Sequence, residues 1–297
     1  MWAIFLRQLA NLLLTIFIAV TLAFFALRLL PGNAIDAQLQ GSGLPPETIE
    51  ARKAALGFDK PIHIQYVDYL IGLVSSDWGQ SLYEGQTVLE IMHSRLPDTL
   101  SLASLSILLG IILGITSGLL SGFNTPVSPI FRTLTDLSLG IPIYFTATIL
   151  LFVIASRIGG IQRGLFLPVL ALGFHTSGAL ARIIESNLKT IQQAPFIQTA
   201  RAKGLSSQAI TRRHMLKLAL LPAIPVIGLQ AGILFSGTVI TETIFGRPGL
   251  GLLLLDATME RDYPVVQGVV VLAAIFYLVM NQIANLTVHL LDPRLTT

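Results

Sequence analysis

Long apolar stretches alternate with short polar segments along this chain. Six stretches without Asp, Glu, Lys or Arg have roughly the length of a membrane-crossing helix, which needs about 20 residues. They are Gln8–Leu27, Thr99–Phe131, Leu137–Ser156, Gly164–Ala181, Leu218–Thr241 and Tyr263–Leu291. The pattern predicts an all-α integral membrane protein with six transmembrane helices.

Glycine and proline occur inside these stretches, for example at Gly110, Gly114, Pro142, Pro222 and Pro225. In lipid, neighbouring helices can satisfy the backbone groups that a proline frees, and small residues allow helices to pack closely. We therefore expect each stretch to form one span.

The composition agrees with a membrane protein and excludes an ordinary soluble domain. Of the 297 residues, 53% are hydrophobic and 12% are charged, and the mean hydropathy is +0.74. The absence of cysteine excludes disulfides and thiolate metal sites. The first apolar run is longer than the core of a signal peptide and lacks a clear cleavage site, so we expect an uncleaved first span.

The placement of the basic residues predicts the orientation. Between Arg182 and Lys217 there are seven basic residues and one acid, Glu185, which places this interval in the cytoplasm by the positive-inside rule. With six spans, both termini then face the cytoplasm. The interval Pro31–Asp98, with nine acids and four bases, falls outside.

This orientation divides the chain into three regions. Residues 1–30 form the N-terminal region and first span, 31–98 form an external segment, and 99–297 form a transmembrane core with a cytoplasmic loop at 183–217. We expect the external segment to contain an amphipathic helix within the run TIEARKAALGF (48–58), ending at Gly57, and a second at Gln65–Val74 that lies on the outer membrane surface.

Two further local features are predicted outside and at the edge of the membrane. The interval Phe245–Asp262 should contain a short amphipathic helix on the external side. Asp136 follows Arg132 by four residues, which predicts an ion pair on one helix face.

The polar, basic interval Ala194–Pro222 is unlike the rest of the chain. Pro195 suits the first turn of a helix and Gly204 suits the residue beyond a helix end, in the left-handed conformation, so Phe196–Lys203 is predicted to be a short helix. Ser206 or Ser207 should cap a following helix, which carries the basic residues Arg212, Arg213 and Lys217.

Small residues on the first of these helices suggest that a partner outside the bilayer grips it. Thr199, Ala200 and Ala202 would permit close docking, and Arg201 and Lys203 could meet acidic or backbone acceptors. The alternative is a positive-inside loop without a docking role.

The residues of most catalytic sites are missing. The five histidines are scattered without metal-ligand spacing, and neither a GxSxG elbow nor a GxxxxGK[ST] phosphate loop occurs. We expect no enzyme activity, cofactor or nucleic-acid partner, and any ATP must be hydrolysed by another subunit.

Three ionisable residues are candidates for a translocation path. His175 lies in the fourth span, where an interhelical hydrogen bond is the alternative role. Glu242 is expected at the external end of the fifth span, within reach of water, and Asp256 lies in the external interval beyond it.

Several motifs resemble those of the membrane permeases of ATP-binding-cassette (ABC) importers of the peptide and nickel type. The permease signature is EAA, three residues, then Gly; the matching positions here are Gln198, Thr199, Ala200 and Gly204. Further similar runs are FIQTARAKGL, RRHMLK, ETIFGRPGLG, RDYPVVQG, LDPRL, LGFDKPIHIQY and RLPDTLSLA. PGNA at Pro31–Ala34, in place of the usual PGDP, and the short loop Arg157–Arg163 depart from the family on the substrate side.

The resemblance implies a type I ABC importer fold in a bacterial cytoplasmic (inner) membrane. A second, homologous permease, two cytoplasmic ATPase subunits and an external solute-binding protein would be the partners. The coupling helix that receives the ATPases would comprise Phe196, Gln198, Thr199, Ala200, Arg201, Ala202, Lys203 and Gly204. The implied substrate is a di- or oligopeptide, with nickel or a metal chelate as the alternative.

Two other classes of function remain open on the residues alone. An ATP-independent channel or secondary transporter would use intramembrane charges as an ion relay, for which His175 alone is well placed. A membrane scaffold without transport activity would give no substrate-dependent phenotype on deletion.

Overall fold

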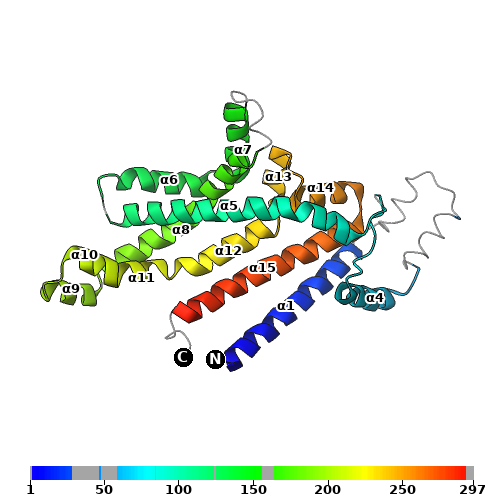
Figure 1. Ribbon diagram of the computed structural model, residues 1–297, viewed down its shortest axis with the longest axis horizontal. Coiled ribbons are helices and arrows are strands. Elements are labelled where there is room, and N and C mark those ends of the chain that lie inside the picture. The colour runs from blue at the N-terminus through cyan, green and yellow to red at the C-terminus, as the bar shows by residue number, and fades with distance from the viewer. Residues whose placement is uncertain are drawn as a thin grey trace. The chain divides into compact units, whose positions relative to one another are not determined.

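The computed structural model describes residues 2–28, 47, 59–83, 85–123, 125–155 and 164–291, and within them the secondary structure is helical apart from one isolated bridge between Gln80 and Thr87. Figure 1 shows the helices in chain order. They are α1 Trp2–Arg28, α4 Ile62–Ser75, α5 Val88–Gly122, α6 Ser128–Gly140, α7 Ile143–Leu150, the π-helix η1 Leu151–Ala155, α8 Phe166–Gln192, α9 Pro195–Ala202, α10 Ser207–Ile210, the π-helix η3 Thr211–Met215, α11 Leu216–Leu220, α12 Ala223–Phe235, α13 Val239–Phe245, α14 Leu250–Glu260 and α15 Tyr263–Leu291.

Four of the described helices are long and apolar enough to cross a membrane by themselves: α1, α5, α8 and α15. Two bent pairs also qualify when each is counted as one span. In the first, α6 and the helix Ile143–Ile154 meet at 106°; in the second, Ser207–Leu220 and α12 meet at 42°. The prediction of an all-helical membrane protein is confirmed, and by length and composition the described helices could supply four to six spans.

The third apolar stretch is not one continuous helix. Ile141 has an extended backbone, with φ −90° and ψ 124°, and Pro142 follows it before α7 begins. A proline disfavours the helical conformation in the residue before it, because its ring clashes with that residue's backbone. The third stretch is therefore broken at this proline.

The other predicted bounds also shift. Helix α5 begins at Val88, so the second span starts in what we expected to be external segment, and it ends at Gly122 instead of Phe131. The fifth stretch is divided at Pro222 and again after Phe235, where Gly237 has a φ of 114°. An apolar run therefore locates a span without locating its ends.

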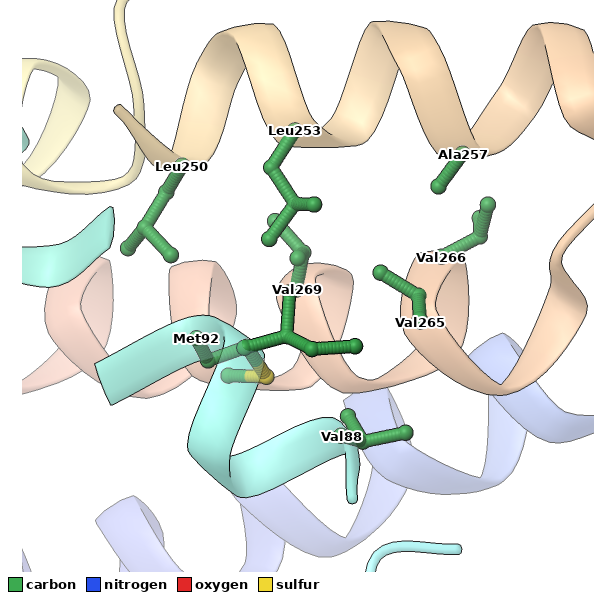
Figure 2. Packing of buried hydrophobic residues seen from close by; sticks show 9 residues of the cluster. Val88, Met92, Leu250, Leu253, Ala257, Val265, Val266 and Val269 are labelled. Atoms are coloured by element: carbon green, nitrogen blue, oxygen red, sulfur yellow. The ribbon is translucent and has the colours of Figure 1, made fainter. Parts of the chain in front are cut away.

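Packing divides the chain into two units, which are described separately: Met1–Asp98 with Pro248–Ile275, and Thr99–Arg247 with Phe276–Thr297. In the first unit, α14 packs on the N-terminal turns of α15 and α5 (Figure 2). The buried residues of this cluster are Val88, Ile91, Met92, Leu250, Leu253, Ala257, Val265, Val266 and Val269. The short helix expected within Phe245–Asp262 is confirmed as α14.

Helix α4 confirms the helical prediction for Gln65–Val74. It packs on α1 through aromatic rings, with Phe24 5.2 Å from Tyr66 and 5.3 Å from Tyr69 between ring centroids. The hydroxyls of Thr21 and Tyr66 are hydrogen-bonded at 2.7 Å. The helix expected at 48–58, the loop 157–163 and the PGNA motif lie outside the described residues.

In the second unit, glycines bring α5 and α8 into close contact. A Cβ atom at Gly114 would lie 2.7 Å from the Cβ of Leu180, and one at Gly118 would lie 2.8 Å from the Cβ of Ile184. Gly110 and Gly122 meet α8 in the same way. Glycines four residues apart thus form the small-residue interface that is typical of packed membrane helices.

Candidate functional site

Helix α9, Pro195–Ala202, begins and ends one residue before the predicted Phe196–Lys203, and the predicted residues stand at its two ends. Pro195 lies in its first turn, where backbone N–H groups have no acceptor within the helix, so the missing N–H of proline costs no hydrogen bond. At the other end Gly204 has a φ of 78°; its N–H donates to Arg201 O at 2.9 Å, and the N–H of Leu205 donates to Ala200 O at 3.2 Å. This pair of bonds is a Schellman motif, so the left-handed Gly204 is confirmed.

The next helical segment begins at Ser206, one of the two predicted caps. Its Oγ accepts a hydrogen bond from the N–H of Ala209 at 3.3 Å. The helix then continues through α10, η3 and α11. The π-helical turn η3, which holds Arg212 and Arg213, was not predicted.

One face of α9 is buried against the chain itself. Ile197 is fully buried and Ala200 is 8% exposed. Both belong to an anchor cluster of six buried residues, drawn from α8, α9, α10, η3 and α11: Leu188, Ile197, Ala200, Ile210, Met215 and Ala219. Eight residues are too few for a stable isolated helix, so this cluster holds α9 in place.

The burial of Ala200 corrects the expectation that its small side chain permits docking of a partner. The methyl group of Ala200 points into the anchor cluster, where a small residue lets α9 approach α8 and the helical segment 207–220. Its role in this conformation is packing.

The opposite face of α9 is open. Phe196 is 46% exposed, and Gln198, Thr199, Arg201, Ala202, Lys203 and Gly204 are exposed as well. Arg212, Arg213 and Lys217 are also exposed on the following segment. We call Arg201, Lys203, Arg212, Arg213 and Lys217 the basic face. Among the described residues, none of the ion pairs of the chain includes a side chain of the basic face.

His175 is half-buried in α8, and its carbonyl oxygen takes part in a hydrogen-bonded contact with α6. The hydroxyl of Ser138 in α6 donates to the carbonyl oxygens of Phe174 and His175, at 2.9 and 3.3 Å. The hydroxyls of Thr176 and Ser177 donate to carbonyl oxygens within α8. The backbone at His175 thus joins α6 to α8.

Glu242 is buried, and the expectation that it lies within reach of water is wrong. It is 1% exposed in α13, and its Oε1 accepts hydrogen bonds from Thr99 at 2.8 Å and from Thr238 at 3.3 Å. These hydroxyls replace water around the carboxylate. Asp256, the third path candidate, is exposed on α14.

The predicted pairing of Arg132 with Asp136 is also wrong. Asp136 pairs with Arg182 of α8, and Arg132 pairs with Glu185 of α8 at 2.9 Å. The four-residue spacing considers one helix alone, whereas α6 packs along α8 and offers nearer partners. Glu185 could have been singled out as the one acid in the basic interval.

No group of three or more His, Cys, Asp or Glu side chains suited to a metal ion occurs within the described ranges. The features of this region are instead a short, anchored helix with an exposed, positively charged face. Such an arrangement suits the docking of an acidic or backbone-lined surface of another protein.

Comparison with known proteins covers nearly the whole chain. Residues 106–297 match a family described as "Binding-protein-dependent transport system inner membrane component", and residues 1–103 match its "Binding-prot-dependent transport system membrane comp, N-term". The chain is 31% identical over 296 residues to the nickel import system permease protein NikB of Staphylococcus aureus strains MRSA252 and USA300. That alignment covers 97% of this chain and 90% of each relative.

Two solved transporters share the fold. An inward-facing MetNI methionine ABC transporter matches with a TM-score of 0.60 and 18% identity, over 68% of this chain and 96% of the other. An amino acid ABC transporter crystallised with histidines matches with a TM-score of 0.53 and 20% identity, over 69% and 94% of the two chains.

Proposed function

The chain belongs to the family of binding-protein-dependent transport system inner membrane components, and from this premise we propose that α9 is the helix through which ATP hydrolysis in other subunits drives transport. The chain itself is a permease component of an ABC importer. It would form half of the translocation pathway, with a second, homologous permease forming the other half.

The observation that carries the proposal is the anchoring of α9. Its buried face is fixed to α8 on one side and to the helical segment 207–220 on the other, while its outer face is free for a partner. A short helix held in this way passes a displacement to the spans that flank it, which is what alternating access requires. The basic face would meet acidic or carbonyl acceptors on the ATPase.

Two ATPase subunits would dock on the paired permeases from the cytoplasm, and an external solute-binding protein would deliver the substrate. In this arrangement α9 lies on the cytoplasmic side of the membrane, and both termini lie on the same side. The positive charge of the interval Arg182–Lys217 supports this orientation.

The substrate is of the peptide or nickel class. The sequence motifs favour a di- or oligopeptide, and the nickel import permeases at 31% identity favour nickel, free or chelated. Uptake measurements with nickel and with a dipeptide distinguish these two candidate substrates directly.

The test is reconstitution of the permease pair in vesicles with its co-encoded ATPases and binding protein. We expect uptake of either radiolabelled nickel or a labelled dipeptide that requires ATP and the binding protein. An ATPase variant unable to hydrolyse ATP is the control, and it should abolish uptake. Uptake at the same rate without ATP would reject the proposal and favour a channel or secondary transporter.

A further inference from the structure

Glu185 joins two basic side chains to one buried carboxylate. Its side chain is 7% exposed, and its Oε1 accepts hydrogen bonds from Arg132 Nε at 2.9 Å and from Lys189 Nζ at 2.5 Å. Arg132 lies on α6, whereas Lys189 lies one turn beyond Glu185 on α8. A buried carboxylate needs such partners, because an unpaired charge away from water is costly.

Arg132 also contacts a third helix. Its Nη2 donates to the carbonyl oxygen of Ser121, in the last turn of α5, at 2.9 Å. One residue further, the carbonyl oxygen of Gly122 accepts from Gln192 Nε2 of α8 at 3.1 Å. Polar contacts therefore join α5, α6 and α8 in the same turns of α5 where Gly118 and Gly122 pack closely on α8.

Helix α8, one of the three joined helices, is also in contact with α9. Leu188, three residues beyond Glu185, is fully buried and belongs to the anchor cluster with Ile197 and Ala200 of α9. A Cβ atom at Gly122 would lie 2.7 Å from Leu188 Cδ2, so the same leucine also touches α5. A displacement of α9 thus reaches α8 at Leu188, one turn from the ionic contact with α6.

From this geometry we infer that Glu185 is a positioning residue, which makes α5, α6 and α8 move as one body when α9 is displaced. The inference rests on the proposed function, in which α9 receives the movement of an ATPase. Loss of the carboxylate leaves the docking face intact, since Glu185 does not contribute to it. It removes the buried contact between Arg132 and Glu185, while the contact of Arg132 with Ser121 remains, and so weakens the connection of α8 to α6 and α5.

A second ion pair provides a matched control. Asp136 and Arg182 connect the same two helices, but their side chains are 61% and 55% exposed. An exposed pair contributes little because water and salt screen it. Asp136→Asn therefore removes a carboxylate from the same helix pair without touching the buried contact.

The experiment measures substrate uptake and ATP hydrolysis on the same vesicles, with nickel ions and a dipeptide as probes. Glu185→Gln should assemble with the ATPase and hydrolyse ATP, but the uptake per ATP should fall by about fivefold or more. Asp136→Asn should keep the parental ratio. Glu185→Asp, which restores the charge, should recover most of the loss.

A parental ratio in Glu185→Gln, or an equal loss in Asp136→Asn, would overturn the inference while the proposed function stands. If Glu185→Gln fails to assemble, Arg132→Lys decides, since a lysine keeps the charge but replaces with one nitrogen the two nitrogens, Nε and Nη2, by which Arg132 holds Glu185 and Ser121. A lowered ratio in this variant supports the inference and an unchanged ratio overturns it. If the parent itself shows no ATP-dependent uptake, the proposed function fails and the inference with it.

Discussion

Ala200 and Ala202 are two residues apart on α9, yet they face different surroundings. Ala200 points into the anchor cluster, while Ala202 is exposed. Ala200→Trp would overfill the cluster and should lower the free energy of unfolding by about 1–3 kcal/mol. Ala202→Trp should fold like the parent and obstruct the docking of the ATPase.

Thermal unfolding in detergent and co-purification of the ATPase distinguish the two alanine variants. Ala200→Trp should melt at a lower temperature, whereas Ala202→Trp should melt like the parent and bring less ATPase with it. An Ala202→Trp protein that binds its ATPase and imports at the parental rate would argue that the outer face of α9 is not the docking surface.

No atom lies within 4 Å of the position that a Cβ atom at Gly204 would take, so a larger side chain would meet no steric obstacle there. Glycine is required at this position for its backbone conformation. Its φ of 78° strains a β-branched residue, so Gly204→Val should cost about 1 kcal/mol or more and misdirect the chain after α9. Gly204→Asn, which tolerates this region, is the matched control. The measurement is ATPase activity and uptake in the inserted permease; parental uptake by Gly204→Val would contradict the account.

Local backbone chemistry explains which residue-level expectations are confirmed. Pro195, Gly204 and Ser206 act through their own backbone or the next few residues, so the sequence reveals their roles. Glu242 depends on a threonine far away in the chain, Thr99, and Ala200 on the direction in which α9 packs. Such long-range surroundings leave no signal in a single sequence.

At the scale of helices, hydrophobicity predicts where the spans lie, but a lack of charge does not define their ends. Helix α5 includes Glu90, Arg95 and Asp98 and therefore starts before the apolar stretch. The break at Pro142 shows that a proline can end a helix within an apolar run. Whether neighbouring helices accommodate a proline depends on packing, which the sequence pattern does not contain.

The glycines of α5 test the close packing of α5 on α8. A Cβ atom at Gly118 would lie 2.8 Å from both Ala181 O and Ile184 Cβ, so Gly118→Ala must push the helices apart. We expect a loss of about 1–3 kcal/mol in the free energy of unfolding. Gly140→Ala in α6, with no atom within 4 Å, should leave the melting temperature unchanged. Equal melting temperatures for the two variants would contradict the packing.

At the scale of the whole molecule, the orientation remains a prediction that the chain is well suited to test, because it contains no cysteine. Asp59→Cys should react with an impermeant reagent in intact cells, and Lys203→Cys should react only after the membrane is opened. The positive-inside rule is the reason for both expectations. The opposite labelling pattern would show that the chain is inverted.

The central claim is that the exposed face of α9 contacts the ATPase, and photo-crosslinking tests it most directly. A photoreactive group would be attached to Lys203→Cys, on this face, and as a control to Asp256→Cys, on α14. In a complex that co-purifies with its ATPase, we predict capture of the ATPase from position 203 and none from position 256. Capture from position 256 without capture from position 203 would contradict the account.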